Sequence, residues 1–136
     1  MEGLSPITDL KNLLQSFRSR GWHTGIATND SIVSTRRQIA DLGIAELFDA
    51  VIASDTVEVP KPSGDMIRKF SLITGVALQE IIMVGDNFHD IEEARRGGAG
   101  LAVAVLSGNG TEADLAHIAD VTLPSIAHLP EYLGHR

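Results

Sequence analysis

Residues 81–90 read IIMVGDNFHD and join an apolar run to a turn that carries two carboxylates. Residues 81–84 are apolar at every position, which is typical of a parallel strand that is buried beneath helices on both faces. Helical periodicity begins at Asp90 and continues to Arg96, where Gly97 and Gly98 end it. The segment therefore predicts a strand, a loop and a helix, with Asp86 and Asp90 just beyond the end of the strand.

The same alternation of strand and helix extends in both directions from this segment. Strands are predicted at residues 22–28, 50–54, 80–85, 101–106 and 121–123. Helices are predicted from the cap Thr8 to Gly21, from the cap Ser31 to Leu42, from Ser63 to Gly75, and over 90–96, 112–118 and 125–133, with a Gly-rich loop at 107–111. Such alternation predicts one α/β domain over residues 1–136, a Rossmann-like doubly wound parallel sheet with helices on both faces.

The composition excludes several classes of protein. The net charge of −7 argues against a nucleic-acid partner, which would require clustered Lys and Arg. The absence of Cys excludes disulfides and cysteine zinc sites, and the five His show no ligand spacing. No apolar run reaches membrane-spanning length, and residues 1–6 lack the regions of a signal peptide. A cytoplasmic location without a membrane partner is the expectation.

Polar side chains follow three of the predicted strands. Thr28 and Asn29 follow the first, Lys61 lies in the loop after the second, and Asp86 and Asp90 follow the third. The carboxyl ends of parallel strands form the usual ligand site of such sheets. Carboxylates suit Mg²⁺, and a metal, a Lys and a hydroxyl together suit a phosphoryl group. Each residue alone has a simpler explanation, as a cap or a loop residue, but their order and setting favour a phosphoryl-transfer site.

With these motifs the chain resembles the haloacid dehalogenase superfamily, and its phosphoglycolate-phosphatase-like branch in particular. The resemblance implies that Thr28, Asn29 and Lys61 bind phosphate, with Thr28 and Lys61 acting as catalytic residues. It implies that Asp86 contacts Mg²⁺ directly and that Asp90 acts through water or by holding Lys61. The resemblance extends to the turn 96–100 and the tail 119–121.

The chain departs from that family at its first motif, the Asp-x-Asp whose first carboxylate attacks phosphorus. Only 27 residues precede Thr28, and none of them forms Asp-x-Asp. The nearest match, residues 53–57, has Ala in the nucleophile position and follows the Thr motif, so we reject it. In the family the missing strand is central, between the strands that end at Thr28 and Gly85, and a helical cap follows it. We therefore expect exposed edges, which favour self-association, poor solubility, or completion by an upstream segment or a partner.

Two functions of different classes remain open. The first is a Mg²⁺-dependent phosphatase of small phosphorylated metabolites that acts through an aspartyl-phosphate, with its nucleophile upstream and the isolated chain inactive. The second is a non-catalytic phosphate-binding or metal-binding module, or a strand-complemented interaction module. A receiver domain is disfavoured because the order of Lys and acidic pair is reversed. A dinucleotide-binding domain is disfavoured because Gly108-Asn109-Gly110 lacks the third Gly and follows the wrong strand.

Overall fold

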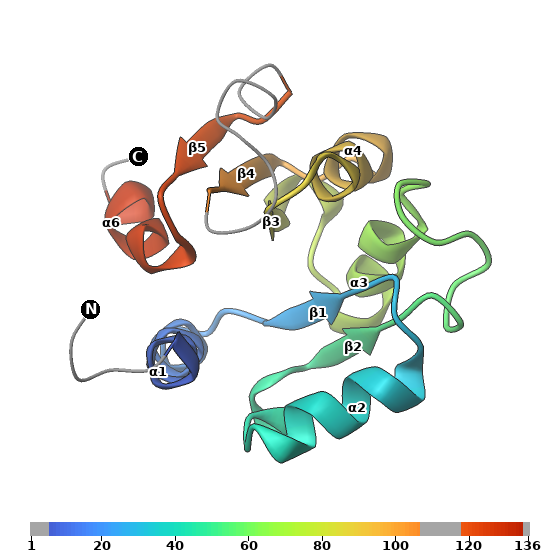
Figure 1. Cartoon of the computed structure of the whole chain (residues 1–136). Coiled ribbons are helices and arrows are strands. Elements are labelled where there is room, and N and C mark those ends of the chain that lie inside the picture. The colour runs from blue at the N-terminus through green and yellow to red at the C-terminus, as the bar shows by residue number, and fades with distance from the viewer. Residues whose placement is uncertain (1–5, 107–117, 135–136) are drawn as a thin grey trace.

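The elements of the chain alternate between helix and strand, as the sequence predicts (Figure 1). The computed structural model describes residues 6–106 and 118–134, apart from the side chains of residues 6–9. The helices are α1 (Pro6–Ser19), α2 (Ile32–Asp41), α3 (Asp65–Thr74), α4 (Phe88–Gly97) and α6 (Leu129–Gly134), with 3-10 turns at Ala45–Leu47, Leu78–Glu80 and Ile126–His128. The strands are β1 (Gly25–Ala27), β2 (Ala50–Ile52), β3 (Ile82–Gly85), β4 (Leu101–Val105) and β5 (Val121–Leu123). The loop predicted at 107–111, and all but the last residue of the helix predicted at 112–118, lie outside the described residues.

The parallel strands are divided between two sheets instead of forming one. β1 pairs with β2 in register Ile26↔Val51, and β3, β4 and β5 form a second sheet in that order. The single continuous sheet predicted from the alternation is therefore interrupted. β1 is an edge strand of the first sheet and β3 is an edge strand of the second. The interruption lies between these two strands, where a missing central strand is predicted.

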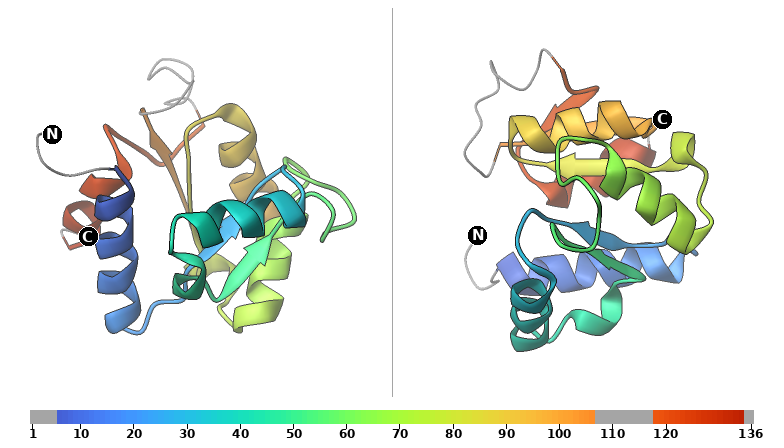
Figure 2. Two further views of the ribbon diagram at one scale, coloured as in Figure 1. Left: turned by 60° about the horizontal axis from the view of Figure 1, so that its bottom comes forward. Right: turned by 90° about the vertical axis from the view of Figure 1, so that its right-hand side faces the viewer.

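Helices cover both faces of the strands, so the doubly wound arrangement is present (Figure 2). Side chains of β4 alternate between the faces: Leu101, Val103 and Val105 pack with Phe17 of α1, whereas Ala102 and Ala104 pack with α3 and α4. The small Ala side chains allow the α4 backbone to lie close to the sheet. β4 therefore lies between α1 on one face and α3 and α4 on the other.

Helix α1 contacts both halves of the interrupted sheet. Leu14 packs with Ile39, Ile44 and Leu47 beside β1 and β2, and Phe17 packs against β4. On the opposite face, α3 contacts β1 and β2 and also packs on α4. The two sheets are thus held together by helices and not by a hydrogen-bonded ladder between them.

Several element boundaries differ from the sequence prediction. α1 begins at Pro6, so Thr8 lies inside the helix and not before it. The strand predicted at 22–28 is only Gly25–Ala27, because the Trp22 N–H donates to the Phe17 carbonyl and so belongs to the turn after α1. Within the described ranges, no helix is long and apolar enough to cross a membrane.

Candidate functional site

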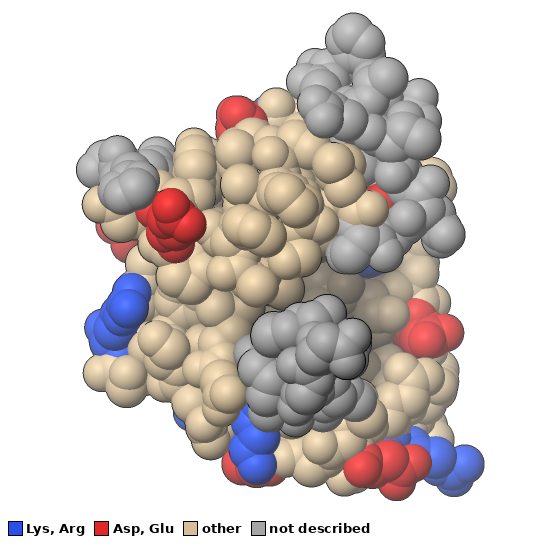
Figure 3. Space-filling view, turned by 60° about the vertical axis from the view of Figure 1, so that its left-hand side comes forward, with Lys and Arg blue, Asp and Glu red and all other residues tan. Residues whose placement is uncertain are grey.

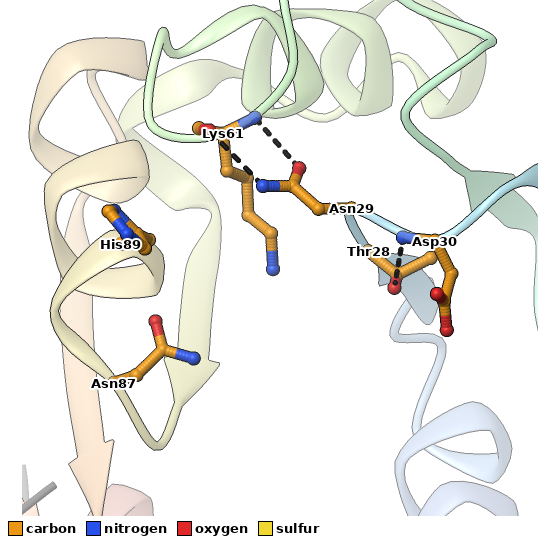
Figure 4. A pocket seen from close by; sticks show the side chains of 6 residues that line it. All are labelled: Thr28, Asn29, Asp30, Lys61, Asn87 and His89. Carbon is orange, nitrogen blue, oxygen red and sulfur yellow. Dashed lines mark hydrogen bonds between the residues drawn. The ribbon is translucent and has the colours of Figure 1, made fainter. Parts of the chain in front are cut away.

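An open pocket lies at the carboxyl ends of β1 and β3 (Figure 4). The residues that line it are Thr28, Asn29, Asp30, Lys61, Asn87 and His89. The structure thus brings together Thr28, Asn29 and Lys61, which the sequence analysis places in one site. It adds Asp30, Asn87 and His89, which are neighbours in sequence of the predicted residues and carry no motif of their own.

Lys61 crosses the interruption between the two sheets. Its ammonium lies 2.5 Å from Asp90 Oδ1 and donates to the Ala27 carbonyl at 3.1 Å. The side chains of Lys61 and Asp90 are only 11% and 9% exposed, so this ion pair is largely shielded from water. A charge-assisted bond in such surroundings is stronger than a surface pair. Lys61 therefore ties the end of β1 to the helix that follows β3.

Asn29 holds the main chain of Lys61 through both ends of its amide. Asn29 Oδ1 accepts the Lys61 N–H at 3.0 Å, and Asn29 Nδ2 donates to the Lys61 carbonyl at 3.2 Å (Figure 4). The side chain thus positions the lysine loop. The phosphate contact expected of Asn29 stays a prediction.

Both carboxylate oxygens of Asp90 are engaged within the protein. Oδ1 pairs with Lys61, and Oδ2 accepts the Asp86 N–H at 3.3 Å. Asn87, and not Asp90, caps α4, since Asn87 Oδ1 accepts the Asp90 N–H at 3.2 Å. A Cβ on Gly85 would collide with the Asp90 side chain, so only glycine permits this close approach. Of the two roles that the resemblance implies for Asp90, this geometry supports holding Lys61.

Asp86, the predicted metal ligand, follows β3 and is not among the residues that line the pocket. One of its oxygens accepts the Asn87 amide at 3.3 Å, which leaves further lone pairs for a cation. Within residues 6–106 and 118–134, no three His, Asp or Glu side chains are grouped closely enough to hold an ion. Mg²⁺ commonly takes one or two carboxylates together with waters and substrate oxygens. Asp86 can therefore offer one carboxylate to a cation, and its role as a metal ligand stays a prediction.

The hydroxyl of Thr28 lies in the pocket at the end of β1. The Thr28 N–H donates to the Ile52 carbonyl at 3.0 Å, and Thr28 Oγ1 accepts the Asp30 N–H at 3.1 Å. A hydroxyl that accepts one bond keeps its own proton for donation. Thr28 can therefore donate to an anionic oxygen in the pocket.

Asp55, in the rejected match to the nucleophile motif, has a structural partner. Its Oδ1 accepts the Ile32 N–H at 2.8 Å, at the start of α2. Ser31 caps the same helix by accepting the Ser34 N–H at 3.1 Å. A carboxylate is favourable at a helix N-terminus. The carboxylate thus stabilises α2.

The chain is similar to known phosphatases over most of its length. It is 27% identical to the pyrophosphatase PpaX of Halalkalibacterium halodurans over 131 residues, which cover 96% of this chain and 61% of that protein. It is 31% identical to a phosphoglycolate phosphatase of Cereibacter sphaeroides over 96 residues, 69% of this chain and 41% of that protein. The chain thus spans about half the length of these relatives.

The fold also matches solved structures. A predicted phosphoglycolate phosphatase from Haemophilus somnus 129pt superposes with a TM-score of 0.84 at 21% identity, covering 96% of this chain and 57% of that one. Residues 1–104 match the family described as haloacid dehalogenase-like hydrolase. The chain therefore belongs to the haloacid dehalogenase-like hydrolase family.

Proposed function

We propose that this chain forms the phosphate-binding and lysine-bearing part of a Mg²⁺-dependent phosphatase of small phosphorylated metabolites. The observation that supports the proposal is the shared pocket of Thr28 and Lys61, with Asp86 at the end of the neighbouring strand β3. A hydroxyl donor, a cation and a carboxylate are the groups required to bind a phosphoryl oxygen, neutralise its charge and hold a metal.

Each of these residues has a separate task in the proposed reaction. The Thr28 hydroxyl donates to a phosphoryl oxygen and orients it. The Lys61 ammonium neutralises charge that develops on the phosphoryl group, while Asp90 keeps the ammonium in place. Asp86 would hold Mg²⁺, which supplies further charge neutralisation when it is bound.

The nucleophile in this proposal is an aspartate outside the present chain. The 27 residues before Thr28 contain no Asp-x-Asp motif. β1 and β3 each have one strand edge without a described partner strand, so a parallel strand inserted between them would complete one sheet and deliver its last residues beside Lys61. The attack would break the bond between phosphorus and the substrate oxygen, release the rest of the substrate and form an aspartyl-phosphate, which water would then hydrolyse to inorganic phosphate.

The substrate class is proposed from the relatives. They include a pyrophosphatase, a phosphoglycolate phosphatase and a glyceraldehyde 3-phosphate phosphatase, at 27%, 31% and 29% identity. All three names describe small phosphorylated compounds. The pocket residue His89, which is exposed, offers a further donor to such a ligand.

A second candidate function is a non-catalytic module that binds phosphate or metal, or that is completed by a partner strand. The specific observation in its favour is that the side chains of Asn29 and Asp90, two of the predicted site residues, are engaged in contacts within the protein.

A fusion experiment distinguishes these functions. The region of the Halalkalibacterium halodurans pyrophosphatase that precedes its match to this chain is fused ahead of Met1, and Mg²⁺-dependent phosphate release is measured with pyrophosphate, phosphoglycolate and glyceraldehyde 3-phosphate. We expect the fusion to release phosphate from at least one substrate and the unfused chain to release none. A folded fusion that binds Mg²⁺ and phosphate without turnover would favour the non-catalytic module.

Substitutions in the fusion assign the metal site. Asp86→Asn removes the negative charge of the proposed ligand, and we expect turnover to fall about 100-fold or more with a higher Mg²⁺ requirement. Asp41→Asn, on the exposed surface of α2, is the matched control and should leave turnover unchanged. Full activity of Asp86→Asn would contradict the metal assignment.

A further inference from the structure

Glu93 is a fully buried carboxylate on α4, with 0% of its surface exposed. Its Oε1 accepts the Gly64 N–H at 2.8 Å, and its Oε2 accepts the N–H groups of Met66 and Ile67 at 3.0 and 3.2 Å. Burying an ionised carboxylate is costly unless hydrogen bonds replace its water. Three backbone donors meet that requirement here, and no buried side-chain polar atom in the described residues lacks a partner.

These three N–H groups form the start of α3. A helix leaves its first N–H groups without partners inside the helix, and the residue before α3, Gly64, has no side chain to cap them. Glu93 supplies that cap from another helix, with a charge that suits the positive end of the helix dipole. The contact fixes the start of α3 against α4.

The same contact bears on Lys61 because Gly64 follows it by three residues. Asp90 and Glu93 are also three residues apart on α4, so they lie on one face of that helix. Asp90 holds the Lys61 ammonium, and Glu93 holds the far end of the lysine loop. The two backbones lie so close that a Cβ on Gly64 would be 2.7 Å from Gly97 N. The position of α4 therefore sets both ends of the lysine loop.

We propose that Glu93 is a positioning residue that fixes the Lys61 loop relative to Asp90. Its meaning for catalysis rests on the function proposed above, whereas the contact itself can be tested without any activity. Asn29 holds the loop at Lys61 from the end of β1, and Glu93 holds it at Gly64 from α4. Loss of the Glu93 contact should let the loop move away from α4 and expose the Lys61 ammonium.

Amine labelling of the whole chain tests this proposal. The chain has three lysines, Lys11, Lys61 and Lys69, so an amine-reactive ester followed by peptide mass spectrometry reports each one separately. In Glu93→Gln we expect the labelling rate of Lys61 relative to exposed Lys11 to rise about threefold or more, because local opening of the loop becomes easier. The Gln amide keeps the shape of Glu93 but presents N–H groups to backbone donors.

A control of similar stability separates positioning from general loosening. The controls are Ile44→Val and Ile44→Ala, which lie in the cluster beside β1 and β2. Urea unfolding measures the stability of each variant, so that one milder and one more severe loss can be compared with that of Glu93→Gln. We expect neither control to change the relative labelling of Lys61. Unchanged labelling in folded Glu93→Gln, or an equal rise in the controls, would overturn the proposal.

Two further measurements complete the test. If Glu93→Gln does not fold, amide exchange in the unmodified chain decides: the N–H groups of Gly64, Met66 and Ile67 should exchange slowly, and rapid exchange would overturn the contact. In the active fusion, Glu93→Gln should lower kcat about 10-fold with little change in KM, as expected for a displaced catalytic group. If the fusion has no activity, the proposed function fails while the labelling result still stands.

Discussion

β4 and β1 are both parallel strands, yet they differ sharply in burial. β4 pairs with β3 and β5, and all five of its residues are buried. β1 pairs with β2 alone in the described structure, has only three residues and leaves Gly25 exposed. A strand with neighbours on both edges can be long and fully apolar, whereas one open edge leaves backbone groups to water. The lower burial of β1 therefore marks the open edge at which the sheet is incomplete.

The three-stranded sheet and the two-stranded sheet are joined by side chains and helices. On one face α1 packs against both, and at the carboxyl ends Lys61 spans the interruption. Figure 3 shows a face with a hollow, and the charged side chains visible on it lie mainly toward the edges of the view. Completion of the sheet by another strand would add ladder hydrogen bonds to contacts that already hold the halves together.

Removing the Lys61 side chain, which links the end of β1 to α4, should have the largest effect on stability. Lys61→Ala leaves the buried Asp90 carboxylate without its cation and frees the Ala27 carbonyl. We expect the free energy of unfolding to fall by about 3 kcal/mol, as for a broken buried ion pair. Urea unfolding measures it, with the exposed Lys11→Ala as control. A loss no larger than that of Lys11→Ala would mean that the halves are held together without this pair.

Equal truncations on an inner and an open strand should have unequal costs. Val103 in β4 is 0% exposed, whereas Val84 in β3, beside the interruption, is only partly buried. We expect Val103→Ala to cost about 2 kcal/mol and Val84→Ala less than about 1 kcal/mol, because little cavity forms where water already has access. The same urea experiment compares them. Equal costs would show that the edge of β3 is as well packed as the sheet centre.

The sequence predicted the strands and helices well because their signals are local. The apolar run before Gly85, and the glycines after each helix, are read from neighbouring residues alone. The interruption follows from the family resemblance, because the Asp-x-Asp motif is missing before Thr28 and in that family its strand lies between those that end at Thr28 and Gly85. The helix starts are less accurate, because α4 begins at Phe88 after its cap Asn87, whereas the periodicity predicts a start at Asp90.

The contacts that hold Lys61 could not be predicted from local patterns. The phosphate contact of Asn29 stays a prediction, and the contact that local patterns do not reveal is the one between its amide and the main chain of Lys61, 32 positions away. Glu93 is a charged residue on a helix, and such residues usually face water. The signal that could have identified it was its spacing of three from Asp90, together with Gly97, which allows α3 to approach closely. Such partners depend on tertiary structure, which the motif order does not encode.

The smallest predicted effect concerns the amino end of the two-stranded sheet, opposite Lys61. Asp49 precedes β2 and lies 2.9 Å from Arg18 of α1, and it accepts the Thr24 N–H at 2.8 Å. Burial alone would raise the pKa of Asp49, but the Thr24 N–H and the Arg18 guanidinium outweigh it and lower the pKa below its usual value of 3.8. A carboxyl with a lowered pKa stabilises the folded chain above the unfolded pKa and loses that effect as pH falls through the folded pKa.

Asp49→Asn should therefore cost about 1 kcal/mol or less near pH 6, since the pair is partly exposed. The difference from the unmodified chain should shrink as the pH falls below 3.8. Urea unfolding from pH 6 to pH 3 measures this, with Asp41→Asn as the exposed control. A difference that persisted undiminished at pH 3 would mean that Asp49 acts through its shape and hydrogen bonds, and not through its charge. The two-stranded half would then be anchored to α1 by packing, and Lys61 would be its main electrostatic tie to the rest of the molecule.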